Sequence, residues 1–237
     1  GGRMVTVGGM AKGSGMIHPN MATMLGYLTT DAVIGRSALQ TALSQAVDQS
    51  FNCITVDGDT STNDTVLCLA NGMAGNQTLK PGSADFRRFC AMVETVCRTL
   101  ALKICWDGEG VTKVVRVEVK RARSTTAAKQ IAHTIATSNL VKTALFGGDA
   151  NWGRVMAALG RAGVPIDPSR VSLQFGDVPM VRNGQGLGRV AEQKLTKVFR
   201  AKEFTIRVDL AQGQAGAHMW TTDLSYEYVR INASYRS

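Results

Sequence analysis

Residues 10–25 read MAKGSGMIHPNMATML, and this stretch joins a glycine-punctuated loop to a strand. A Gly-Ser-Gly turn follows Lys12, the one Lys or Arg of the stretch. Residues Met24 to Thr30 are rich in apolar and β-favouring types, which predicts a buried strand. Thr23 therefore stands where the loop enters the strand.

Thr23 has the surroundings of a self-cleavage site. If the bond between Ala22 and Thr23 breaks, Thr23 gains a free α-amine beside its hydroxyl, and the amine can serve as the base for that nucleophile. The pKa of such an amine, about 7.7–8.0, suits the task near neutral pH. The alternative is that Thr23 is an ordinary strand residue, since threonine is common in strands.

The segment resembles the ornithine acetyltransferase family, also called glutamate N-acetyltransferases. Its members cleave themselves at an Ala-Thr bond inside a K-G-x-G-M…M-A-T-M-L motif, and the match here has no gap. The likeness extends from about Val7 to Ser237. It implies that residues 1–22 are the tail of an upstream alpha chain and that residues 23–237 are the catalytic beta chain.

Composition places few limits on this interpretation. The chain has 237 residues, of which 44% are hydrophobic and 19% charged, as in ordinary globular proteins. Its formal charge of +9 can attract anions, but the positive residues are scattered and the densest cluster, Lys120-Arg121-Arg123, lacks aromatic neighbours, so we expect no nucleic-acid partner. No apolar run is long enough to span a bilayer, so no membrane role is expected. Five cysteines without a C-x-x-C pair suggest neither zinc nor disulfides, and a cytoplasmic location fits.

Hydrophobic periodicity predicts alternating strands and helices, and hence an α/β protein. In the first helix, from about Ser37, the apolar stripe is expected at Leu39, Leu43, Val47 and Phe51. The last helix, 224–231, would be capped by Thr222 or Asp223. The other expected strands are 54–56, 65–70, 112–120, 141–146, 171–175, 204–210 and 219–222, and the other expected helices are 84–104, 126–139, 151–160 and 189–199. The resemblance implies more: an αββα layered sandwich of the ornithine acetyltransferase or DmpA-like type, completed by an upstream segment that this sequence lacks.

Two substrate-binding residues are implied by matching motifs. Lys12, in K-G-S-G-M, falls where the family places a substrate-contacting lysine, and it could attract the substrate carboxylate. Glu109, in D-G-E-G-V-T-K, matches a family loop whose glutamate binds substrate, and it could pair with an ammonium group. Without the resemblance, Lys12 would be a solvated loop lysine and Glu109 a turn residue.

Two more candidates come from the ending Y-V-R-I-N-A-S-Y-R-S. The family ends similarly, with its asparagine and its final hydroxyl residue lining the substrate site. The resemblance therefore adds Asn232 and Ser237 to the substrate-binding residues.

Two loops leave alternatives open. The polar loop Asp57 to Asp64 has the oxygens of a metal site but fails the EF-hand pattern, because Cys68 stands at the twelfth position. It is expected to be structural, with Asx-type caps, or to brace the site from behind. The loop Gly147 to Arg154, G-G-D-A-N-W-G-R, could hold an anion or simply connect a strand to a helix. No metal is assigned.

The reaction implied by the family is acetyl transfer from N-acetylornithine to glutamate through an acetyl-Thr23 intermediate, in arginine biosynthesis. No cofactor is expected, although acetyl-CoA could be a second donor. The oxyanion hole would come from a Thr-Gly pair of the upstream chain, in a heterotetramer of two alpha and two beta chains. The rivals are an amidase or aminopeptidase, in which water replaces glutamate, and a non-catalytic metabolite-binding relative.

Overall fold

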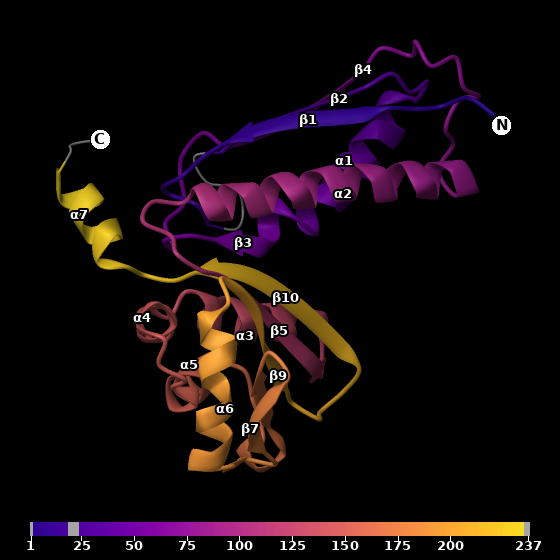
Figure 1. The fold of residues 1–237 in the computed structure, drawn as a ribbon. Coiled ribbons are helices and arrows are strands. Elements are labelled where there is room, and N and C mark those ends of the chain that lie inside the picture. The colour runs from indigo at the N-terminus through magenta and orange to yellow at the C-terminus, as the bar shows by residue number, and fades with distance from the viewer. Residues whose placement is uncertain (1, 19–23, 235–237) are drawn as a thin grey trace. The chain divides into compact units, whose positions relative to one another are not determined.

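The computed structural model describes residues 2–18 and 24–234. The chain divides into two compact units, Gly1–Asp107 and Gly108–Ser237. In each unit, helices pack on a β-sheet (Figure 1), so the predicted α/β layering is confirmed. Within the described residues, no helix is both long and apolar enough to cross a membrane.

The sheet of the first unit has three strands in the order β1-β2-β4, with β2 antiparallel to β1 and parallel to β4. Two helices that pack on each other lie along one face of this sheet (Figure 1). The strands expected at 24–30, 54–56 and 65–70 are confirmed. In chain order, the elements are β1 (Val7–Lys12), β2 (Leu25–Thr30), α1 (Arg36–Asp48), η1 (Phe51–Cys53), β3 (Ile54–Thr55), β4 (Thr65–Ala70) and α2 (Ala84–Asp107).

The helical face of this sheet is closely packed. Leu28 of β2 is fully buried. Its register partner Gly9 has little room for a side chain, because an added Cβ would lie 3.1 Å from Leu100 Cδ1 of α2 and 3.0 Å from the Tyr27 carbonyl oxygen. The small residue therefore lets the long helix approach β1 directly.

The buried stripe of α1 differs from the one expected. Its buried residues are Ala38, Ala42, Leu43 and Ala46, whereas two members of the expected stripe, Leu39 and Val47, are half-buried. Helices packed through small side chains approach more closely, so alanines rather than the largest apolar residues form the contact face.

The second unit holds a longer sheet, whose strands within this unit run in the order β10-β5-β9-β6-β7-β8. β5 is parallel to β9, and the other neighbouring pairs in this order are antiparallel. The predicted alternation of the strand at 112–120 is confirmed, although the hairpin of β7 and β8 was not expected. The strands are β5 (Val114–Ala122), β6 (Ser172–Phe175), β7 (Val178–Arg182), β8 (Gln185–Gly186), β9 (Glu203–Asp209) and β10 (Ala215–Thr222).

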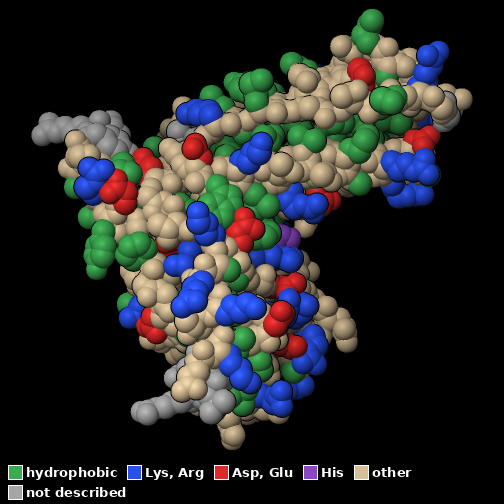
Figure 2. All heavy atoms as spheres, in the orientation of Figure 1, with side chains coloured by type: hydrophobic (Ala, Val, Ile, Leu, Met, Phe, Trp, Pro, Cys, Tyr) green, Lys and Arg blue, Asp and Glu red, His purple; other side chains and the backbone are tan. Residues whose placement is uncertain are grey.

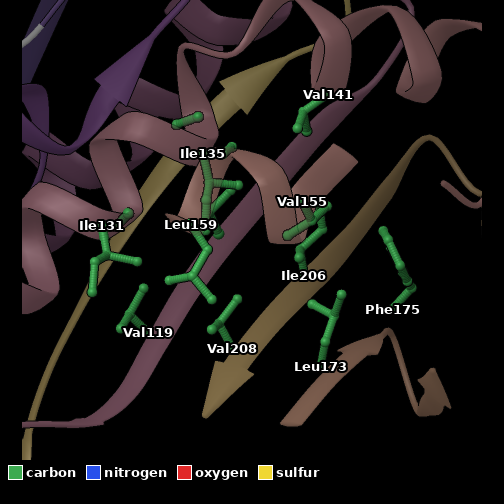
Figure 3. Packing of buried hydrophobic residues seen from close by; sticks show 14 of the residues in the cluster. Val119, Ile131, Ile135, Val141, Val155, Leu159, Leu173, Phe175, Ile206 and Val208 are labelled. Atoms are coloured by element: carbon green, nitrogen blue, oxygen red, sulfur yellow. The ribbon is translucent and has the colours of Figure 1, made fainter. Parts of the chain in front are cut away.

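The main hydrophobic core lies between this sheet and its helices. α3 packs on β5 and β10, α5 packs on α3, and α6 packs on β7. Figure 3 shows Ile131, Ile135 and Leu159 of these helices directed at valines of β5 and β9. The helices of the unit are α3 (Thr125–Ala136), α4 (Asn139–Gly147), α5 (Trp152–Gly160), the short η2 (Pro168–Arg170), α6 (Arg189–Arg200) and α7 (Tyr226–Ser234).

The strand expected at 141–146 is wrong, because these residues belong to α4. Val141, Ala144 and Leu145 are buried at helical spacing. From the sequence alone, a short apolar run of this kind cannot be assigned to a buried helix rather than a buried strand. Gly148 ends the helix in the left-handed conformation, with φ of 66°.

Candidate active site

Glu109 and Asn232 meet although they are 123 positions apart. The amide Nδ2 of Asn232 donates to Oε2 of Glu109 at 2.7 Å, and also to the Tyr228 carbonyl one turn earlier in α7 at 3.0 Å. The glutamate is half-buried and the asparagine is exposed. A carboxylate and an amide that share a hydrogen bond at an open position can both reach a polar ligand.

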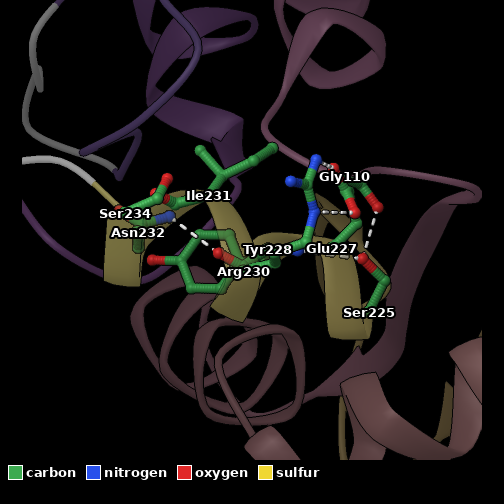
Figure 4. A network of polar contacts seen from close by, with 8 residues as sticks. All are labelled: Gly110, Ser225, Glu227, Tyr228, Arg230, Ile231, Asn232 and Ser234. Atoms are coloured by element: carbon green, nitrogen blue, oxygen red, sulfur yellow. Dashed lines mark hydrogen bonds and ion pairs between the residues drawn. The ribbon is translucent and has the colours of Figure 1, made fainter.

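Gly110 fixes the distance between this loop and α7. Its φ is +67°, and an added Cβ would lie 2.5 Å from the Tyr228 nitrogen and 2.7 Å from Ser225 Oγ. Ser225 Oγ donates to the Gly110 carbonyl at 2.7 Å and accepts from the Tyr228 N–H at 3.2 Å (Figure 4). Ser225 is therefore the cap of α7, and the expectation that Thr222 or Asp223 caps it is wrong.

Asp223 instead forms hydrogen bonds with the backbone that directly follows the D-G-E-G loop. It is 4% exposed, and its carboxylate accepts from the Thr112 N–H and the Lys113 N–H, each at 2.9 Å, and from the Thr112 hydroxyl. Lys113 Nζ in turn donates to the Leu145 carbonyl at 2.9 Å, near the end of α4. Thr112 and Lys113 of the D-G-E-G-V-T-K motif are thus structural.

A buried lysine, Lys142, binds the end of β10, just before the chain enters α7. Lys142 of α4 is 3% exposed, and its ammonium group donates to the Thr222 carbonyl, to Thr222 Oγ1 at 3.0 Å and to Thr221 Oγ1 at 3.4 Å. An ammonium group this deeply buried needs such partners. Sequence reasoning missed Lys142 and the anchor role of Asp223, because neither residue belongs to a recognisable spacing pattern.

In the first unit, strand pairing places Lys12 opposite the first residue of β2. Lys12 ends β1, is exposed, and pairs with Leu25 of β2, two residues after Thr23. Ala22 and Thr23 themselves lie outside the described residues, as does Ser237.

The loop from Asp57 to Asp64 forms hydrogen bonds with the backbone before residue 19 and after residue 23. Asp57 accepts from the Met16 N–H at 2.7 Å and from the Ile17 N–H at 3.0 Å. Asp64 Oδ1 accepts from the Met24 N–H at 2.6 Å. Burial raises the pKa of Asp57, while these backbone hydrogen bonds oppose the shift.

Backbone hydrogen bonds join the same segments as these side-chain contacts. The Val56 N–H donates to the Ile17 carbonyl at 2.8 Å, and the Thr65 N–H donates to the Met24 carbonyl at 3.0 Å. Among the described residues, no group of three or more His, Cys, Asp or Glu could hold a metal ion. Within the loop, Oδ1 of Asp57 also accepts from the Asp59 N–H at 3.3 Å, which is the local Asx-type contact that the composition suggested.

The loop Gly147 to Arg154 joins two helices rather than a strand and a helix. Asn151 caps α5 by accepting from the Arg154 N–H at 3.2 Å, and its amide donates to Asp149 at 3.1 Å. A side chain of the loop itself thus caps the N-terminus of α5. This favours a connecting loop over an anion-binding site.

The sequence matches the model of the ArgJ family over residues 1–237. The chain belongs to the ArgJ family. It is 54% identical over 237 residues to the arginine biosynthesis bifunctional protein ArgJ of Symbiobacterium thermophilum and 52% identical over 237 residues to that of Geobacter sulfurreducens. Both matches cover all of this chain but only 59% and 60% of the relatives, so the chain spans about three-fifths of their length.

A solved ArgJ structure shares the fold. The crystal structure of arginine biosynthesis bifunctional protein ArgJ from Bacillus halodurans matches with a TM-score of 0.83 and 40% identity. The match covers 87% of this chain and 97% of the solved one. At that identity and score, the α/β layered fold is the fold of the ArgJ family.

Proposed function

We propose that this chain is the catalytic part of an acetyltransferase of arginine biosynthesis, which moves an acetyl group from N-acetylornithine to glutamate. The observation that carries the proposal is the junction of Glu109 and Asn232, since two motif residues far apart in sequence share one hydrogen bond at an exposed position. Membership of the ArgJ family supports the reaction class. Cytoplasmic location is part of the proposal.

The first proposed step is self-cleavage. Thr23 Oγ attacks the Ala22 carbonyl carbon, the C–N bond breaks as an ester forms, and the proton passes to the nitrogen. Water then hydrolyses the ester, leaving a carboxylate on Ala22 and a free amine on Thr23. This divides the precursor into an alpha chain that ends with residues 1–22 and a beta chain of residues 23–237.

The length of the solved relative supports such a division. Because 87% of 237 residues corresponds to 97% of the solved chain, that chain is about 213 residues long. Residues 23–237 would make a chain of almost the same length, whereas full-length curated relatives are much longer.

The second step is acetyl transfer in two halves. The Thr23 hydroxyl attacks the amide carbon of N-acetylornithine, its amine takes the hydroxyl proton, and ornithine leaves with a proton on its nitrogen. Glutamate then attacks the acetyl ester with its own amine, forming N-acetylglutamate and regenerating the hydroxyl. Preorganised donors for the oxyanion would come from the upstream chain.

The described residues suit the charges of these substrates. The Glu109 carboxylate can accept from a substrate ammonium group, and the Asn232 amide beside it can turn toward a substrate oxygen. Lys12 provides a positive charge at the end of β1 for a substrate carboxylate. Ser237 is proposed as a further contact.

The open face of the first sheet supports the upstream chain as a partner. Met10, Tyr27 and Leu67 lie in register across the three strands and are 69%, 42% and 47% exposed, and Leu69 beside them is 65% exposed. Figure 2 shows hydrophobic side chains gathered on this part of the surface. We propose that the remaining two-fifths of the precursor covers this face, in an assembly of two alpha and two beta chains.

A competition assay tests the proposal. The precursor, expressed with its natural upstream segment, is given N-acetylornithine with a labelled acetyl group, with and without glutamate. The proposal predicts labelled N-acetylglutamate when glutamate is present and little free acetate when it is absent. Acetate as the main product in both cases would favour the amidase alternative, and no product at all would favour a binding protein.

The relatives' description as bifunctional suggests a second test. Labelled acetyl-CoA replaces N-acetylornithine as the donor to glutamate. Formation of labelled N-acetylglutamate would make acetyl-CoA a substrate of this protein. If no labelled product forms, N-acetylornithine is the donor and acetyl-CoA is not.

A further inference from the structure

The helix α7, which carries Asn232, has little apolar packing to hold it in place. All of its residues are described, and none of them is buried. Tyr226 and Val229 are 84% and 60% exposed, although the Tyr226 ring makes a T-shaped contact with Phe146, with 5.5 Å between the ring centroids. Because most of the stability of a short helix normally comes from burial of an apolar face, the position of α7 depends on the contacts at its ends.

Both ends of α7 bond to neighbouring residues of one loop. At its start, Ser225 Oγ donates to the Gly110 carbonyl at 2.7 Å (Figure 4). Two turns later, Asn232 Nδ2 donates to Glu109 Oε2, also at 2.7 Å. All four residues belong to the second unit. The loop that carries Glu109 therefore holds α7 at two points.

The two hydrogen bonds of Ser225 have different chemical requirements. Ser225 is 4% exposed, and its oxygen accepts from the Tyr228 N–H at 3.2 Å, which is the ordinary contact of a helix cap. Its hydroxyl hydrogen is used in the other bond, to the Gly110 carbonyl. A cap needs only an acceptor, so the donated bond has a purpose other than starting the helix.

The distance from Ser225 to Asn232 makes this bond important for the site. Seven residues of helix span roughly 10 Å. A tilt of about 10° at Ser225 would thus move Asn232 by about 2 Å, which is enough to break a hydrogen bond. The direction of α7 is therefore decided where Ser225 meets Gly110.

We propose that Ser225 is a positioning residue for the substrate. Its bond to the Gly110 carbonyl fixes the direction of α7 and thereby places Asn232 beside Glu109. The inference rests on the proposed function, in which Glu109 and Asn232 contact the substrate. Ser225 itself acts only through these two residues.

The test changes one side chain in three ways. Ser225→Ala loses both bonds, Ser225→Asp can cap but cannot donate, and Ser225→Thr keeps a hydroxyl that can do both. The matched control is Ser124→Ala. Ser124 is exposed and caps α3 of the same unit by accepting from the Ala127 N–H at 3.1 Å, so this variant loses a cap far from the Glu109 loop in sequence.

Each precursor is expressed with its natural upstream segment, and the melting temperature, kcat and KM for N-acetylornithine are measured. We expect Ser225→Ala and Ser225→Asp to raise KM by about fivefold, which corresponds to one lost hydrogen bond, with kcat nearly unchanged. Ser225→Thr should keep KM close to that of the unaltered protein. Ser124→Ala should lower the melting temperature slightly and leave KM unchanged.

Three results would overturn the proposal while leaving the proposed function intact. The first is a Ser225→Ala protein with an unchanged KM. The second is a Ser225→Asp protein with an unchanged KM, since the cap alone would then suffice. The third is an equal rise of KM in Ser225→Thr or Ser124→Ala, which would indicate a general loss of packing. If the unaltered precursor transfers no acetyl groups, the proposed function fails, and this inference fails with it.

Discussion

Replacing Gly110 by alanine should separate the D-G-E-G loop from α7. The added Cβ would lie 2.5 Å from the Tyr228 nitrogen and 2.7 Å from Ser225 Oγ, so the loop or the helix must move. A non-glycine residue at a φ of +67° costs roughly 1–2 kcal/mol. Loss of the hydrogen bond from Ser225 to the Gly110 carbonyl costs roughly 1 kcal/mol more.

Together these terms amount to about 2–3 kcal/mol, which for a chain of this size lowers the melting temperature by roughly 4–12 °C. Glu109 moves with its neighbour, so KM for N-acetylornithine should also rise several-fold. Differential scanning fluorimetry and steady-state kinetics measure the two effects.

Gly147→Ala in α4 is the matched control, because its added Cβ meets nothing within 4 Å and its φ is not positive. It should leave stability unchanged or slightly higher, since alanine favours helices. If Gly110→Ala has the same melting temperature and KM as the unaltered protein, the contact between the loop and α7 does not position Glu109.

Three further predictions concern single side chains. Asp223→Ala should lower the free energy of unfolding by roughly 3–5 kcal/mol, measured by denaturant titration, because buried donors lose a charged acceptor; a loss below about 1 kcal/mol would contradict its role as anchor. Burial raises the pKa of Glu118, but the hydrogen bond from Arg207 and nearby positive charges outweigh it and lower the pKa below 4.5. The resulting stability is present above pH 4.5 and lost as pH falls through the lowered pKa, so the deficit in melting temperature of Glu118→Gln at pH 7 should shrink steadily as pH falls below 4.5; a deficit that stays constant over the whole acid range would refute this. Burial raises the pKa of the Cys97 thiol to about 12, so alkylation at pH 8 should leave Cys97 unmodified in the native protein and modify it after denaturation, as peptide mass spectrometry would report.

Local patterns predicted most of the elements because their periodicity was clear. The alternating residues 112–120 could only be a half-buried strand, and the structure has β5 there. Residues 141–146 were ambiguous, since a short apolar run fits a buried strand or a buried helix equally well. The packing of Val141 and Leu145 against the core decides between them, and that depends on distant residues.

The candidate site was predictable residue by residue but not as an arrangement. Motif resemblance pointed to Lys12, Glu109 and Asn232, yet no local pattern says that Glu109 and Asn232 share a hydrogen bond. The same holds for Asp223, which a local reading assigned to helix capping. Its real partners, Thr112 and Lys113, lie more than a hundred residues earlier.

For the loop from Asp57 to Asp64, by contrast, composition predicted the kind of contact but not its partners. Its composition alone suggested Asx-type contacts, and Asp57 makes one with the Asp59 N–H. Asp57 and Asp64 also accept from the Met16 and Met24 N–H groups, which belong to a distant part of the chain. Short polar side chains form these bonds readily wherever a neighbouring strand offers a free N–H. Which strand would offer it depends on the tertiary fold and could not be predicted.

The central claim is that Thr23 becomes the N-terminal nucleophile and carries the acetyl group. Intact mass spectrometry tests it on the precursor expressed with its natural upstream segment, before and after mixing with N-acetylornithine, beside a Thr23→Ala variant. The account predicts a fragment that starts at Thr23 and gains one acetyl group, and a variant that stays whole and unmodified. An uncleaved, unmodified chain for the unaltered protein would contradict it.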